Sequence, residues 1–240
     1  VWYGSALLLA LRSSPIPFEL AHSLQPGRDT FGRPILPLVL DASLRSTGFA
    51  LAAVALSSAI ALLGAAGLSI APRRLAAIPE SLLDFLVAFP SVLFALSMAA
   101  WVGPGASTVM GALILGIAPS LSRNLLARAR ELQSLEFMQA SRALGAGTGR
   151  LVIRHLVPHL IPIVSVKFPA LLMGALLTEA SLSFLGLGFS AGTESWGTLL
   201  AQARDYLIEA PGISLYVGIP LLFSIWSFDV ISKRLEPELR

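Results

Sequence analysis

Six apolar segments restrict what this chain can fold into more than any other feature of its sequence. Their approximate ranges are 1–12, 46–71, 81–102, 105–124, 156–186 and 210–232. An α-helix needs about 20 apolar residues to cross the hydrocarbon core of a bilayer, and all but the first segment reach that length. We interpret 1–12 as the end of a first helix whose beginning is missing from this numbering. Because open strands cannot satisfy their backbone hydrogen bonds in lipid, we expect every segment to be helical.

The composition also favours a membrane protein. Charged residues make up 13% of the chain and the mean hydropathy is +0.77, whereas a soluble domain carries about 25% charged residues. We therefore predict an all-α polytopic membrane protein with about six transmembrane helices, built as a single transmembrane domain over residues 1–240.

The residue content argues against catalysis and against a bound cofactor. The chain has no cysteine, which excludes disulfides, thiolate metal ligands and a cysteine nucleophile. The histidines, His22, His155 and His159, are too scattered for a metal site. The glycine-rich stretch 145–150 lacks the lysine of a phosphate-binding loop and follows no strand. We expect no catalytic, cofactor-binding or metal-binding residues, and a net charge of +3 gives no reason to expect nucleic acid.

The basic residues are distributed unevenly and indicate an orientation. Those that follow the second, fourth and sixth segments are Arg73, Arg74, Arg123, Arg128, Arg130, Arg142, Arg150, Arg154, Lys233, Arg234 and Arg240. The positive-inside rule then places 70–80, 124–156 and the C-terminus in the cytoplasm, and 13–45, 103–106 and 187–209 outside.

The segment 124–156 is the only substantial loop on the predicted cytoplasmic side. Ser134 is a plausible N-cap for a helix over about 135–144, with Glu136 in its first turn. Such a helix has nearly flat faces of small residues, which another protein can approach closely. Gly145, Gly147 and Gly149 are expected to stop it and allow a sharp turn. A surface helix meeting anionic lipid headgroups is the alternative; it explains the arginines, but neither the small residues nor the glycines.

The loop resembles the cytoplasmic coupling loop of bacterial ABC importer permeases. That family has Glu-Ala-Ala, a glycine four residues later and a Leu-Pro pair before the next span. The matching positions here are Gln139, Ala140, Ser141, Gly145, Val157 and Pro158. The spacing is kept, but Gln replaces Glu, Ser replaces Ala and Val replaces Leu. The resemblance implies that 134–150 is a coupling helix that contacts an ATPase through Glu136, Gln139, Ala140, Ser141, Ala143, Leu144 and Gly145.

Further stretches resemble the dipeptide/oligopeptide/nickel permeases, in particular their second, C-type subunit. They are 29–33, 82–91, 179–188, 195–197, 204–207 and 234–240. The resemblance implies a homologous permease subunit, ABC ATPase subunits and an extracytoplasmic solute-binding protein as partners, in the bacterial cytoplasmic (inner) membrane. It also implies that ATP is hydrolysed in a separate subunit, and that the solute is a di- or oligopeptide, nickel or a related small solute.

Two regions beyond the coupling loop are candidate functional sites. The external loop 187–209 is expected either to receive the solute-binding protein or to plug the path, through Trp196, Gly197, Arg204, Asp205 and Tyr206; an interfacial segment on the lipid headgroups is the alternative. Charges at membrane depth are often functional. We favour structural roles for Asp84, Lys167 and Asp229, and leave Glu179 open between the solute path and packing.

Two other classes of membrane protein are compatible with six spans. An ion-gradient-driven secondary transporter often shows internal repeats, which we do not find between the halves of this chain. A membrane scaffold without transport activity is the third class. An ATPase that co-purifies with the chain would separate the three.

Overall fold

The computed structural model describes residues 27–29, 32–190, 192–208 and 211–235. The predicted segment 1–12 and the end of the C-terminal tail lie outside these residues. The helices are α3 (Ile35–Ile70), α4 (Arg73–Ala88), α5 (Ser91–Val102), α6 (Ala106–Gln133), α7 (Glu136–Ala143), α8 (Thr148–Leu151), the π-helical turn η1 (Val152–Leu156), α9 (Val157–Phe184), α10 (Trp196–Arg204) and α11 (Pro211–Leu235).

The all-α polytopic prediction is confirmed. Within the described residues, four helices are long and apolar enough to cross a membrane: α3, α6, the continuous helix from Thr148 to Phe184, and α11. A fifth span is present if α4 and α5 are taken together across a bend of 98°. These spans correspond to the predicted segments other than 1–12.

Two predicted boundaries are wrong. The segment expected from residue 46 starts as a helix at Ile35, and Asp41 and Arg45 in its first turns form an i,i+4 ion pair at 2.9 Å. The segment expected at 81–102 is two helices. Pro90 has no N–H and holds φ at −60°, and the preceding Phe89 is extended, so the chain turns there.

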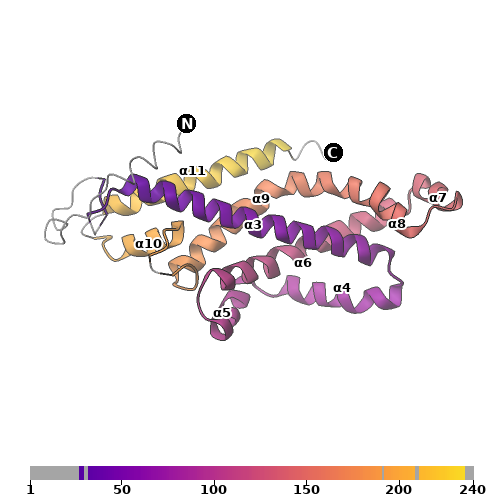
Figure 1. Ribbon diagram of the computed structural model, residues 1–240, viewed down its shortest axis with the longest axis horizontal. Coiled ribbons are helices and arrows are strands. Elements are labelled where there is room, and N and C mark those ends of the chain that lie inside the picture. Colours follow the sequence, from indigo (N-terminus) through magenta and orange to yellow (C-terminus); the bar gives the residue numbers. More distant parts are fainter. Residues whose placement is uncertain (1–26, 30–31, 191, 209–210, 236–240) are drawn as a thin grey trace.

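Small residues allow the central helices to pack closely. Helix α3 lies along α6 and α9 (Figure 1) and buries a row of alanines, among them Ala42, Ala50, Ala61 and Ala65. In a membrane, where lipid is as apolar as leucine, such close backbone contact is a main source of helix association.

The molecule is elongated, and its two ends differ (Figure 1). Helices α7 and α8 lie at one end, beyond the tips of α6 and α9; α10 lies at the other, beside the start of α3 and the end of α9. Helix α9 therefore connects the two ends, which are called the α7 end and the α10 end below.

Candidate functional site

At the α7 end, a short helix stands where the coupling helix was predicted. It begins at Glu136, but the prediction of Ser134 as its N-cap is wrong. Helix α6 runs to Gln133, so Ser134 ends that helix and its hydroxyl donates a hydrogen bond of 2.7 Å to the Glu131 carbonyl. The residue that precedes α7 is Leu135, which gives no side-chain cap.

Gly145 ends α7 through a Schellman motif. Its φ is +82°, its N–H donates to the Arg142 carbonyl at 2.9 Å, and the Ala146 N–H donates to the Ser141 carbonyl at 3.1 Å. The other two glycines do not act as predicted. Gly147 has an ordinary φ of −65° before α8, and Gly149 is inside that helix. The turn therefore depends on one glycine rather than three.

The predicted contact residues lie mainly on the exposed side of α7. Glu136, Gln139, Ala140, Ala143, Leu144 and Gly145 are exposed and Ser141 is half-buried. Leu144, at the end of the helix, is 89% exposed. The opposite side is anchored by Met138, which is buried.

Side-chain contacts connect α7 to the transmembrane helices. The Phe137 ring stacks on His159 of α9, with ring centroids 5.6 Å apart. Arg142 donates to the Gln133 side chain at 2.9 Å, and Gln133 in turn donates to the Ser69 carbonyl of α3 at 3.0 Å. A cavity of about 320 Å³ beside these contacts is lined in part by Met138 and Arg142. Displacement of α7 would therefore act on α3, α6 and α9.

At the α10 end, the loop 187–209, which was predicted to be external, folds back into the protein. Ser195 caps α10 in a reciprocal capping box with Thr198. Trp196 is 1% exposed and Gly197 is buried, so the expectation that Trp196 offers an outer docking or lipid-anchoring surface is wrong. The backbone N–H of Trp196 donates to the Ser46 hydroxyl of α3 at 3.1 Å, and this long-range contact joins the start of α10 to α3.

The other end of α10 remains accessible. Arg204, Asp205 and Tyr206 are exposed. The Arg204 guanidinium lies 5.3 Å from the centre of the Phe184 ring and 3.3 Å from the Asp205 carboxylate. The contact with Phe184, the last residue of α9, joins the end of α10 to the end of α9.

An ion-pair cluster missed in the sequence ties α3 to the loop before α10. Arg33 bonds Asp29 at 2.7 Å and Glu194 at 2.8 Å. Partial burial acts to lower the pKa of Arg33, but the hydrogen bonds and charges of Asp29 and Glu194 outweigh it and raise the pKa above its ordinary value. Arg33 and Asp29 lie in the stretch 29–33, but nothing in the sequence pointed to Glu194 as their partner.

The titratable residues near the spans divide as follows. Asp84 pairs with Arg123 at 2.8 Å and Asp229 with Lys233 at 2.6 Å, ion pairs that are compatible with structural roles for both. Lys167 and Glu179 form no ion pair with any described residue. Glu179 is fully buried and accepts a hydrogen bond of 2.8 Å from Ser183.

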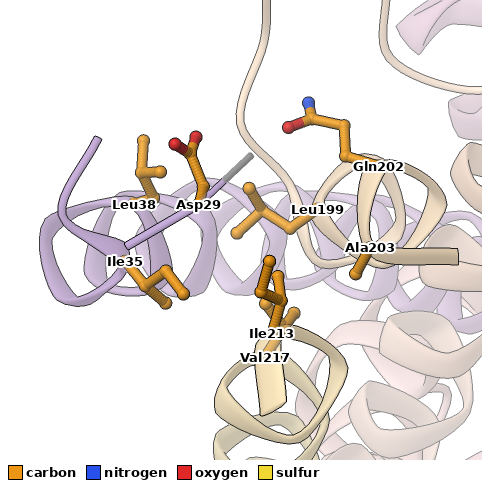
Figure 2. A pocket seen from close by; sticks show the side chains of 8 residues that line it. All are labelled: Asp29, Ile35, Leu38, Leu199, Gln202, Ala203, Ile213 and Val217. Carbon is orange, nitrogen blue, oxygen red and sulfur yellow. The ribbon is translucent and has the colours of Figure 1, made fainter. Parts of the chain in front are cut away.

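A small cavity at the α10 end does not hold a solute. It lies between α3, α10 and α11. Figure 2 shows the polar side chains of Asp29 and Gln202 above Leu199, and the apolar side chains of Ile213 and Val217 below it. Its volume of about 10 Å³ is close to the lower limit for one water molecule. Among the described residues there is also no group of three or more His, Cys, Asp or Glu side chains able to hold a metal ion.

Comparisons with known proteins agree with this architecture. Residues 60–240 match the family model described as the binding-protein-dependent transport system inner membrane component. A putative peptide transport system permease of Brucella suis is 34% identical over 89% of this chain and 72% of its own length. A putative peptide permease of Brucella ovis is 34% identical over 95% and 74%. The di/tripeptide transport system permease DppC of Pseudomonas aeruginosa is 31% identical over 89% and 72%.

The fold also resembles a solved transporter. A chain of the inward-facing MetNI methionine ABC transporter superposes with a TM-score of 0.68, covering 86% of this chain and 98% of that one, at 17% identity. At that identity the likeness concerns the fold alone. The family match and the peptide permease relatives identify the chain as a member of the binding-protein-dependent transport system inner membrane components, and within them as a peptide-type permease subunit of an ABC importer.

Proposed function

We propose that this chain is one of two homologous permease subunits that together enclose the path of an ATP-driven importer in the bacterial cytoplasmic membrane. Two ABC ATPase subunits bind its cytoplasmic face, and an extracytoplasmic solute-binding protein delivers the solute outside. The solute is a di- or oligopeptide or a related small solute. The names of the Brucella and Pseudomonas relatives support the peptide class.

The observation that carries this proposal is the construction of α7. Its outer side has small side chains at Ala140 and Ala143 that give a partner close access, and Leu144 projects from its end. Its other side buries Met138, and the helix is joined to α6 by the Arg142–Gln133 hydrogen bond and to α9 by the Phe137–His159 stack. A helix with one free side and one fastened side can receive a push and pass it on.

The mechanism follows from these connections. Closure of the ATPases on ATP displaces α7, and the Phe137–His159 stack transfers the displacement to α9. Rocking of α9 with its neighbours then switches access from the outside to the cytoplasm, as a rigid-body transition between two states. The energy comes from the different affinities of the partners for the two states.

At the α10 end, the exposed residues after α10 receive the solute-binding protein. Arg204 and Tyr206 are of the residue types enriched at protein interfaces, and Asp205 adds a charge of the opposite sign beside them. Trp196 and Gly197 are enclosed behind this surface and hold α10 in place.

Substitution of Ala140 tests the docking role of α7. Ala140→Glu places a carboxylate in the close contact with the ATPase, where a buried unpaired charge costs at least about 1–3 kcal/mol. We expect ATP-dependent uptake in proteoliposomes to fall at least about fivefold, since each 1.4 kcal/mol is about tenfold. Ala140→Ser, which keeps a small side chain, is the matched control and should transport normally.

The readouts distinguish a docking defect from a folding defect. Both variants should insert and pair with the second permease in equal amounts, and only Ala140→Glu should release the ATPase. If Ala140→Glu takes up solute at the wild-type rate, α7 is not the docking helix. Uptake driven by an ion gradient without ATP would instead indicate a secondary transporter.

A further inference from the structure

A buried polar cluster joins three helices at the α10 end. It comprises Glu179 and Ser183 of α9, Ser46 of α3 and Ser195 at the start of α10. The Ser183 hydroxyl donates to Glu179 Oε1 at 2.8 Å, and the hydroxyls of Ser46 and Ser195 also lie near the Glu179 carboxyl group. The Ser46 hydroxyl in turn accepts a hydrogen bond of 3.1 Å from the backbone N–H of Trp196 in α10. All four residues of the cluster are buried, and Glu179 is at its centre.

The backbones around the cluster are packed too closely for slippage. A Cβ atom added at Gly197 would overlap the Ala180 carbonyl oxygen, and one added at Gly188 would overlap the Ser183 hydroxyl. Helix α10 therefore approaches α9 at a distance that only glycine permits. Hydrogen bonds require a particular distance and angle, so the polar groups of the cluster can pair in only one arrangement of these closely packed helices.

Glu179 is a costly residue at such a position. Its Oε2 has no hydrogen-bond partner among the described residues, and its side chain is fully buried. An apolar side chain of similar volume would avoid the desolvation cost of the carboxyl group. Because the side chain reaches no surface, contact with a solute does not account for it. Its position does: the carboxyl group accepts from Ser183 on its own helix and lies near the hydroxyls of Ser46 of α3 and Ser195 at the start of α10, at the point where the three helices meet.

We propose that Glu179 is a positioning residue that locks α10 to α3 and α9, so that binding at the exposed end of α10 moves all three helices together. Arg204 contacts Phe184, the last residue of α9, and the first residues of α9 bear the Phe137 contact from α7. Helix α9 is unbroken between these points. The cluster is thus the joint through which an outer partner acts on α9 and, at its other end, on α7. This inference rests on the proposed function, since it requires both partners.

The test compares Glu179→Ala with Glu179→Gln in the complete complex with the second permease, the ATPases and the loaded binding protein. Glu179→Ala should leave basal ATP hydrolysis unchanged and reduce its stimulation by the binding protein about fivefold or more, which is the lower end of typical coupling between sites. Glu179→Gln should largely restore stimulation, because its amide can accept from Ser183 and donate to the neighbouring hydroxyls. Ser181→Ala, an exposed neighbour whose hydroxyl bonds only its own helix, is the control.

A distance measurement tests the joint without activity. Because the chain has no cysteine, spin labels can be attached at Leu44→Cys on α3 and Tyr206→Cys beyond α10, both exposed positions. The distribution of distances between them should broaden in Glu179→Ala and stay narrow in Ser181→Ala.

Three results would overturn the proposal. An unchanged stimulation ratio and distance distribution in Glu179→Ala would remove the positioning role. Basal and stimulated hydrolysis falling together with the amount of complex would make the cluster merely stabilising. Equal defects in Glu179→Gln and Glu179→Ala would show that the negative charge is required, and not the hydrogen bonds on which the proposed positioning depends. If the wild-type complex shows no stimulation by any binding protein, the proposed function fails rather than this inference.

Discussion

At Gly145, one backbone angle decides where α7 ends. The residue has φ +82°, and a Cβ atom built there would meet nothing within 4 Å. Any penalty for a larger residue therefore comes from the backbone itself rather than from a clash with neighbours. The sequence predicted three helix-stopping glycines here, but composition alone cannot show which one adopts a positive φ. That depends on where the hydrogen bonds of α7 close.

Gly145→Val should loosen α7 without disturbing the transmembrane helices. A β-branched residue in this region of φ costs about 1–3 kcal/mol, so we expect faster amide exchange over residues 138–146. Gly147→Val is the matched control, since Gly147 is exposed and has φ −65°. Gly145→Asn should be tolerated better, because asparagine adopts this conformation more readily. Equal exchange in the Gly145→Val and Gly147→Val proteins would show that the positive φ is not what ends the helix.

At the scale of elements, hydropathy located the spans but not their ends or bends. Proline lies inside α4, α6, α9 and α11 without breaking them, so Pro90 could not be recognised from the sequence as the site of a 98° bend. Helix α10 was missed for another reason. Its Ser195–Thr198 capping box is visible in the sequence, but its burial depends on a contact with Ser46, which is 150 positions away.

The contact between α7 and α9 is open to a direct test. Phe137→Ala removes the ring that stacks on His159, an interaction worth about 0.5–1.5 kcal/mol for an aromatic pair. We expect ATP hydrolysis to continue while uptake per ATP falls several-fold, because the push on α7 no longer reaches α9 efficiently. Phe137→Tyr keeps the ring and should couple normally. Unchanged uptake per ATP in Phe137→Ala would assign the transfer to Met138 and Gln133 instead.

At the scale of the whole molecule, the arginines at the α7 end set the predicted orientation, although several are paired. Arg123 bonds Asp84, Arg128 bonds Glu131 and Arg130 bonds Glu80. Pairing does not cancel the effect, because the positive-inside rule counts Lys and Arg while Asp and Glu contribute little. The α7 end should therefore be cytoplasmic and the α10 end external.

Cysteine labelling in membranes without the ATPase subunits tests this orientation. Leu144→Cys and Ile208→Cys are the probes of choice, since these side chains are 89% and 96% exposed. An impermeant thiol reagent should modify Leu144→Cys only in inside-out vesicles and Ile208→Cys only in right-side-out vesicles. Ser195, which the loop prediction placed outside, is fully buried, so Ser195→Cys should react from neither face until the protein is unfolded. Labelling of Leu144→Cys and Ile208→Cys from the same side would contradict the topology, because α9, which is expected to cross the membrane, lies between these two residues in the chain.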